Sequence, residues 1–173
     1  ALEQLRQRMV AVSQSPELLD ALKTGNEVVI DRYRQELART FPEANSIQLI
    51  ELGPLGIAAL KKDQVQLRNH IEKDMLRLAS NGETVAPEAY QEGKQWIFSL
   101  SQAIQDEKLK YASGALLISL DDDYLRKLLN QIDPGLGQST LLQQTKSSAK
   151  IIVSAGISSE NNASESSTVA SVP

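Results

Sequence analysis

The sequence has 173 residues, of which 41% are hydrophobic and 23% charged, with a formal net charge of −4, a composition typical of a globular domain. The acidic balance argues against nucleic-acid binding, because proteins of that class need a basic surface. The absence of cysteine excludes disulfides, thiolate metal sites and cysteine nucleophiles.

The first residues predict a helix with a narrow apolar stripe, formed by Leu2, Leu5, Met9 and Val12 at three- and four-residue steps. Such a stripe either packs the helix on its own domain or forms the seam of a homodimer. The chain opens directly in this helical register at Ala1. We therefore expect it to be a segment of a longer protein.

Two more helices are predicted before residue 45. Ser15 is a suitable N-cap with Pro16 at the first helical position, and Gly25 ends this short helix. Thr24 and Glu27 stand in capping-box spacing, which predicts the start of the next helix.

The segment SIQLIELGPLGIAALKK, residues 46–62, predicts a hairpin of two short strands around a Gly-Pro turn. A helix is predicted over 64–79, followed by a loop through Pro87. His70, the only histidine, lies in this helix beside Asn69 and Glu72, which indicate a solvent-exposed face.

Strands dominate the next part of the sequence. Alternation around Trp96 and Phe98 predicts one strand, and the apolar run 112–120 predicts another that pairs with it antiparallel. Further strands are predicted near Leu141 and Ile151. This order predicts an α+β fold with a central antiparallel sheet and long N-terminal helices packed on one side.

The three adjacent aspartates Asp121, Asp122 and Asp123 raise the question of a metal site. A calcium loop needs acids at alternate positions and a glycine where Arg126 stands. Neighbouring helical residues also point about 100° apart, whereas acids favour the positive end of a helix dipole. The aspartates therefore predict the start of a helix.

No catalytic motif is evident in the sequence. G-x-S-x-G, H-E-x-x-H and phosphate-loop patterns are missing, so we expect a non-catalytic domain without a cofactor. An enzyme would need carboxylates such as Asp121 with Asp74 or Glu72 to meet in the fold. A ligand pocket has four candidate residues, although core or surface placement is the plainer interpretation of each: Arg77, Tyr90, Trp96 and Phe98.

Four parts of the sequence follow one another in a distinctive order: the N-terminal helix, the segment 46–62, KQWIFSLSQAI and ASGALLISLDDDYLRKLL. This order resembles that of the extracytoplasmic PAS-like sensor domains of bacteria, the Cache or PDC type. The resemblance covers 1–156, with Gly114 opening the apolar strand and the aspartates at its junction with an amphipathic helix. It implies a periplasmic domain, anchored in the membrane by flanking segments, that binds a small molecule or a partner. The aromatic-and-arginine cluster of amino-acid-binding members is missing.

A second resemblance involves TFPEANSIQLIELGPLG, DMLRLASNGETVAPEAY and GLGQSTLLQQ. These segments are similar to the N-terminal extension of long-form bacterial phosphomannomutase/phosphoglucomutase. It implies that a catalytic domain lies further along the full-length protein.

Three regions are expected on these grounds: N-terminal helices over 1–45, a PAS-like sensor core over 46–156, and a Ser- and Asn-rich linker or tail over 157–173. The expected function is a sensory or regulatory domain that signals through its N-terminal helix. The alternative is a dimerisation or protein-interaction module that binds no ligand.

Overall fold

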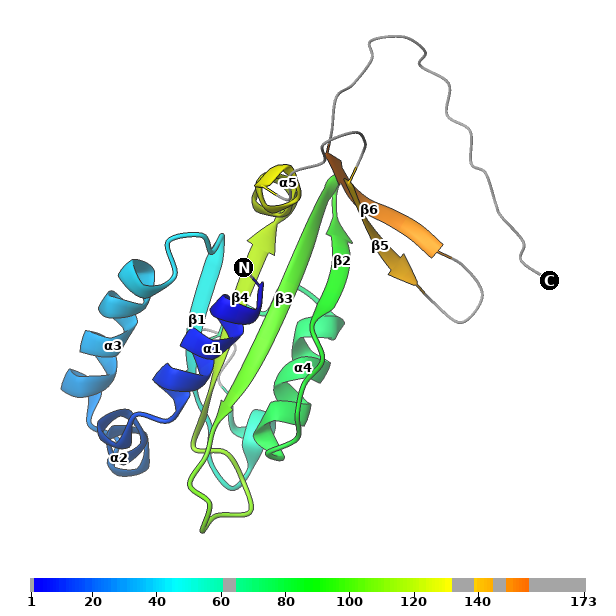
Figure 1. Cartoon of the computed structure of the whole chain (residues 1–173). Coiled ribbons are helices and arrows are strands. Elements are labelled where there is room, and N and C mark those ends of the chain that lie inside the picture. Colours follow the sequence, from blue (N-terminus) through cyan, green and yellow to red (C-terminus); the bar gives the residue numbers. More distant parts are fainter. Residues whose placement is uncertain (1, 61–64, 132–138, 145–148, 156–173) are drawn as a thin grey trace, which may run out of the picture. The chain divides into compact units, whose positions relative to one another are not determined.

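The computed structural model describes residues 2–60, 65–131, 139–144 and 149–155 (Figure 1). The chain divides into two compact units, Ala1–Asp121 and Asp122–Pro173. Helices and antiparallel strands occur in both units, which confirms the predicted α+β class.

A four-stranded antiparallel sheet forms the centre of the first unit. Its strands lie in the order β1 (Ser46–Glu51), β4 (Gly114–Asp121), β3 (Gln95–Ile104) and β2 (Glu88–Glu92). β3 and β4 pair antiparallel as predicted, with Ser99 opposite Ser119. Because β4 is central and buried on both faces, its sequence is a continuous apolar run rather than an alternating one.

The N-terminal helices are α1 (Leu2–Ser13), α2 (Pro16–Thr24) and α3 (Glu27–Thr40). α1 lies across β3 and β4, and α3 lies against β1 (Figure 1). The apolar stripe of α1 faces inward, since Leu5 and Met9 are fully buried. The first helix is thus part of the core of this unit.

The ends of α2 and α3 follow from their capping residues. Ser15 accepts a hydrogen bond from the Leu18 N–H at 3.4 Å, and Gly25 ends α2 with a left-handed φ of 68°, as predicted. α3 begins differently, because Asn26 is its N-cap. The predicted capping role of Thr24 is therefore wrong: its hydroxyl donates to the Asp20 carbonyl, one turn back in α2.

The opposite face of the sheet is covered by α4 (His70–Ser80). Side chains alternate between the two faces of a strand, and Ala115 and Leu117 of β4 lie on the α4 side. They belong to one apolar cluster: Ile50, Met75, Leu76, Ala79, Val85, Ala115 and Leu117.

The predicted hairpin at 46–62 is wrong. β1 is followed by a short 3-10 helix, Gly56–Ala59, and its strand partner is β4 instead. The apolar residues Leu52, Ile57 and Leu60 pack against the cluster on the α4 side. Their hydrophobicity reflects this packing and not a second strand.

A strand that was not predicted from the sequence, β2, directly follows the predicted loop and pairs with the first half of β3. Glu92 lies opposite Gln95, and Gly93 takes a left-handed φ of 62° in the turn between them. The charged and polar residues of β2 suit an edge strand, which explains why hydrophobicity did not reveal it.

The second unit contains α5 (Asp122–Gln131) and a two-stranded antiparallel sheet, β5 (Ser139–Gln144) with β6 (Ala149–Ala155). Asp122 and Asp123 lie in the first turn of α5, which confirms the predicted helix start. The strands predicted near 141 and 151 are confirmed as well, whereas the tail over 157–173 lies outside the described residues. In the described segments, no helix has the length and apolar character needed to span a membrane.

Candidate functional site

The four residues predicted for a pocket do not gather in one place. Tyr90 is buried opposite Ile97 on the α4 side of the sheet. Trp96 and Phe98 alternate with Ile97, so they face the other side, where both are half-buried. Arg77 is exposed on α4, with its Nε 3.7 Å from the Asp74 carboxylate.

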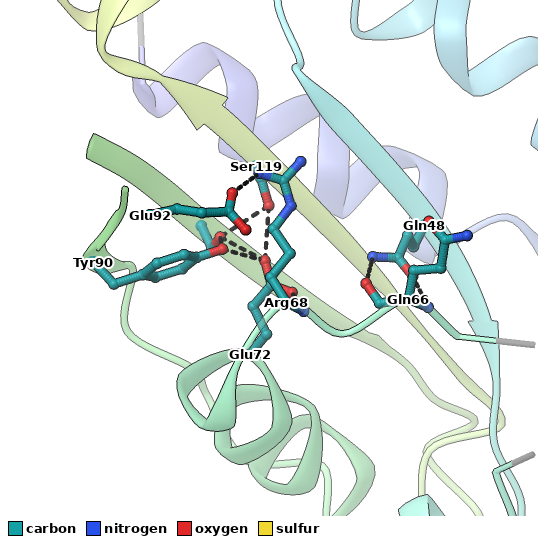
Figure 2. Close-up of polar contacts among 8 residues, drawn as sticks. Gln48, Gln66, Arg68, Glu72, Tyr90, Glu92 and Ser119 are labelled. Atoms are coloured by element: carbon teal, nitrogen blue, oxygen red, sulfur yellow. Dashed lines mark hydrogen bonds and ion pairs between the residues drawn. The ribbon is translucent and has the colours of Figure 1, made fainter. Parts of the chain in front are cut away.

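Tyr90 instead joins a buried polar network around the carboxylate of Glu72 (Figure 2). Glu72 Oε1 accepts hydrogen bonds from the hydroxyls of Tyr90 at 2.5 Å, Ser119 at 3.2 Å and Ser99 at 3.3 Å. Its Oε2 accepts one from the Arg68 backbone N–H at 2.8 Å. Because Glu72 has no exposed surface, the predicted solvent-exposed face is wrong at this position.

Local structure brings these groups together. Asn69 caps α4, and its Oδ1 accepts from the Glu72 N–H at 3.0 Å, which places Glu72 in the first turn, near the positive end of the helix dipole. Ser99 and Ser119 face each other across β3 and β4, with their Oγ atoms 2.9 Å apart. The network therefore joins the start of one helix to three strands.

The energetics of the network depend on its complete hydrogen bonding. A buried carboxylate is costly unless its oxygens are paired, and four donors serve those of Glu72. Burial and, after it, the hydrogen bond to Glu72 together raise the pKa of Tyr90 to about 12, because both favour the neutral phenol. Tyr90 thus remains a donor over the physiological pH range.

Polar contacts on the solvent side hold the segment before α4. Arg68 donates to the Glu92 carboxylate at 3.0 Å, which links this segment to β2 (Figure 2). Gln48 on β1 makes two hydrogen bonds with the backbone of Gln66, at 3.0 and 3.1 Å. The segment leading into α4 is therefore fixed at both edges of the sheet.

The geometry of the network is that of a structural anchor. Both oxygens of Glu72 are engaged with donors of the protein. Asp74, the other carboxylate that an enzyme hypothesis would pair with Asp121, is exposed beside Arg77. Across the residues that the structure describes, no cluster of three or more His, Cys, Asp or Glu side chains is placed to hold a metal ion.

A cavity of about 310 Å³ lies beside α1 and offers a different kind of site. Three residues of α1 and the following Gln14 line it on one side, and residues 82–85, the second half of β3 and Gln105 line it on the other. Its lining residues are Arg6, Val10, Ser13, Gln14, Gly82, Glu83, Thr84, Val85, Ser101, Gln102, Ala103 and Gln105.

The second half of β3 has a free edge at this cavity, within the part of the chain that the structure describes. β2 pairs only with residues 95–99, whereas β3 continues to Ile104. β2 and β3 are joined by a two-residue hairpin, in which the backbone of Gln95 is hydrogen-bonded to Glu92 of β2. Every second residue of β3 after Gln95 directs its backbone N–H and C=O groups to that same side of the strand. Ser101 and Ala103 therefore direct their backbone polar groups toward this edge.

The side chains around the cavity are mainly polar. Arg6 and Glu83 carry opposite charges, and in the described residues Arg6 forms no ion pair. The hydroxyl of Ser101 is buried and has no hydrogen-bond partner there. A buried hydroxyl in this state costs about 1–3 kcal/mol. A ligand recovers that cost only when the Ser101 side chain turns this hydroxyl toward the cavity, because the Oγ atom itself is buried.

A second cavity, of about 270 Å³, lies between α3 and β1 and includes Arg34 in its lining. This arginine is already paired, because it lies 2.7 Å from Asp31, 2.6 Å from Glu51 and 3.6 Å from Glu27. Its charge is compensated within the protein, so the cavity beside α1 is the better candidate for a ligand.

The N-terminal stripe, predicted as a signalling or dimer helix, packs within its own domain. Leu5 and Met9 are fully buried, whereas Leu2 and Val12 are half-buried. Arg8 ties the same helix to the end of α3, since it donates to the Thr40 carbonyl at 2.6 Å. α1 is thus held by core packing on one face and borders the cavity with other residues.

Neither the grouping of Glu72 with Ser99 and Ser119 nor the place of Arg6 and Glu83 at the cavity was predicted from the sequence. Asn69-x-x-Glu72 has the spacing of a capping box, and this spacing is the sequence signal that places Glu72 in the first turn of a helix. The serines interrupt apolar strand sequences, which is a weaker signal. Cavity-lining residues from three distant segments leave no local pattern.

Comparison with known proteins assigns no family to the chain. The chain matches no protein-family model and no curated protein. The cavity and the Glu72 network are therefore the features on which a functional proposal rests.

Proposed function

We propose that this chain is a non-catalytic sensory domain of a larger, membrane-anchored bacterial protein, located on the extracytoplasmic side of the membrane. It binds a small molecule in the cavity beside α1 and transmits binding through α1 to an output domain elsewhere in the full-length protein. The resemblance to PAS-like sensor domains motivates the location. The central antiparallel sheet preceded by helices is compatible with that resemblance.

One observation carries the proposal: the cavity has α1 as one wall and the free half of β3 with residues 82–85 as the other. A ligand that contacts both walls stabilises some positions of α1 on the sheet more than others. Such differential contact is what a ligand needs in order to shift a conformational equilibrium. Small shifts of a packed helix are a common form of switching movement.

The remainder of the unit supplies a fixed frame for such a movement. The Glu72 network anchors α4 to β2, β3 and β4 on the opposite face. α1 is held mainly by apolar contacts around Leu5 and Met9, which have no directional preference comparable with hydrogen bonds. We therefore expect ligand binding to displace α1 more than α4.

The first test is thermal unfolding of the purified chain with carboxylates, amino acids, sugars, sugar phosphates, polyamines and divalent ions. A ligand at about 100 times its dissociation constant adds about 2.7 kcal/mol, which raises Tm by several degrees. A reproducible rise with one chemical class supports a sensor. No rise with any class, over a cooperative transition, contradicts it and favours the interaction module that binds no ligand.

The second test follows α1 itself by hydrogen exchange with and without the stabilising compound. We expect altered protection in residues 2–13 and unchanged protection in α4. Equal changes in both helices would indicate general stabilisation and contradict signalling through α1.

A further inference from the structure

We propose that the cavity beside α1 binds a small, neutral polyhydroxyl compound of the size of one sugar ring or a short linear polyol, and that the Ser101 side chain turns its buried hydroxyl toward the bound ligand. This inference rests on the proposed function and names the ligand class for the same site. The cavity has a volume of about 310 Å³, at the lower end of the range for ligand pockets, roughly 300–1,000 Å³. A single small molecule therefore fills it.

The charge of the lining favours a neutral ligand. Arg6 and Glu83 are the charged side chains among the lining residues, and their charges have opposite signs. A ligand with one net charge gains from one of them and is repelled by the other. A neutral molecule that offers both donors and acceptors satisfies the two together.

The uncharged lining groups suit hydroxyls in particular. Serine, threonine and glutamine side chains each combine donors with acceptors, as alcohols do. Gln14 and Thr84 make no side-chain hydrogen bond within the described residues, so both are available to a ligand. The backbone N–H groups of Ser101 and Ala103 and the Ser101 carbonyl add further donors and an acceptor along the free edge of β3, whereas the Ala103 carbonyl already accepts from Gln102 Nε2 at 3.4 Å.

Ser101 differs from Gln14 and Thr84, which are exposed at the cavity. Its Oγ is buried without a partner, so the ligand-free protein bears the cost of an unpaired hydroxyl. Ser113 provides a matched comparison, because its Oγ is also buried and unpartnered but it does not line this cavity. Substituting each serine by alanine removes the same kind of buried hydroxyl, but only the substitution of Ser101 should also weaken ligand binding.

The test uses isothermal titration and thermal unfolding of the full chain with glucose, mannitol and myo-inositol at low millimolar concentrations. Glycine betaine represents zwitterions, and acetate and spermidine represent anions and cations. Saturable binding is required, because high concentrations of polyols stabilise proteins without a site. The variants are Ser101→Ala and Ser113→Ala, with a second pair of exposed glutamines: Gln14→Ala in the turn after α1, and Gln35→Ala on α3.

We expect saturable binding of at least one polyol, weakened roughly two- to tenfold by Ser101→Ala and unchanged by Ser113→Ala. Neither serine variant should be less stable than the parent without ligand. Binding of the zwitterion or the ions alone would overturn the ligand class but leave the sensor proposal standing. Polyol binding that is equally insensitive to both serine variants would overturn the assignment to this cavity, and no binding at all would overturn both.

Discussion

At the scale of single residues, the most informative group is the Glu72 carboxylate. Its burial is tolerated because Tyr90, Ser99, Ser119 and the Arg68 N–H serve its oxygens. Removing one donor leaves the buried carboxylate of Glu72 with an unsatisfied acceptor, so single substitutions in such a network are costly. Stability measurements on these residues therefore report directly on the anchor of α4.

Replacing Tyr90 by Phe should remove a pH-dependent component of stability. The folded pKa of about 12 lies above the value near 10 in the unfolded chain, so the folded state holds this proton more tightly. The contribution is fully present below pH 10 and is lost as the pH rises toward 12. Urea unfolding between pH 8 and 12 should show a decline of about 2–3 kcal/mol attributable to this group.

The Tyr90→Phe variant should be less stable at pH 8 by about 1–3 kcal/mol, since a hydrogen bond to a charged group is lost. Its decline between pH 10 and 12 should be smaller than that of the parent chain. Parallel declines in both proteins would show that Tyr90 is not the group responsible.

Glu72→Gln should destabilise the protein by about 2–4 kcal/mol, although the side chain keeps its shape. The carboxamide retains one acceptor, but its NH₂ group must then face either the Arg68 N–H or the hydroxyl donors. Urea unfolding at pH 7 measures the loss. Glu88→Gln, an exposed position on β2, is the control and should change stability by less than about 0.5 kcal/mol.

At the scale of elements, the start of β4 depends on a close approach that only glycine permits. A Cβ at Gly114 would lie 2.9 Å from the Ile50 carbonyl oxygen and 2.9 Å from Leu22 Cδ1. β1 and α2 therefore both approach the backbone at this point. The resemblance to sensor domains drew attention to this glycine, and packing provides its physical reason.

Gly114→Ala should lower stability by about 1–3 kcal/mol, because the backbone of β1 must move to admit the methyl group. Gly53→Ala is the matched control. Nothing lies within 4 Å of a Cβ there, so it should be neutral or slightly stabilising. Equal urea midpoints for the two variants would contradict the steric explanation.

Elements with strong local signals were predictable from the sequence, and elements defined by long-range packing were not. The alternation around Trp96, the apolar run of β4 and the Ser15 and Gly25 caps predicted their elements well. The predicted hairpin failed because Leu52 and its apolar neighbours pack under α4 instead of pairing as strands. β2 escaped notice because an edge strand needs little hydrophobicity.

The candidate site was less predictable than the fold. Tyr90 was selected as a pocket residue, but the structure places it in the anchor of α4, while the cavity draws on residues from α1, 82–85 and β3. These segments are far apart in sequence, and polar residues such as Gln14 and Thr84 resemble ordinary surface residues. Only the folded chain brings them together.

At the scale of the whole molecule, the chain consists of two units that meet in sequence between β4 and α5. The first contains the four-stranded sheet, α1 to α4, the Glu72 network and the cavity. All the features that support the proposed function are thus contained in Ala1–Asp121.

A chain ending at Asp121 should therefore fold cooperatively and retain polyol binding. Circular dichroism and urea unfolding test the first expectation, and titration calorimetry tests the second. A chain ending at Ser113, which lacks the central strand β4, should be unfolded. An unfolded product from the longer truncation would show that the second unit is required for the first to fold.

The Ser99–Ser119 pair has a consequence for how the sheet selects a single strand alignment. β4 is apolar along nearly its whole length, so hydrophobicity alone hardly distinguishes the native alignment with β3 from one slipped by two residues. In a slipped sheet, the two hydroxyls would no longer face each other, and Glu72 would lose donors that its burial requires. The buried carboxylate therefore favours the native alignment of β3 with β4 over one that is slipped by two residues.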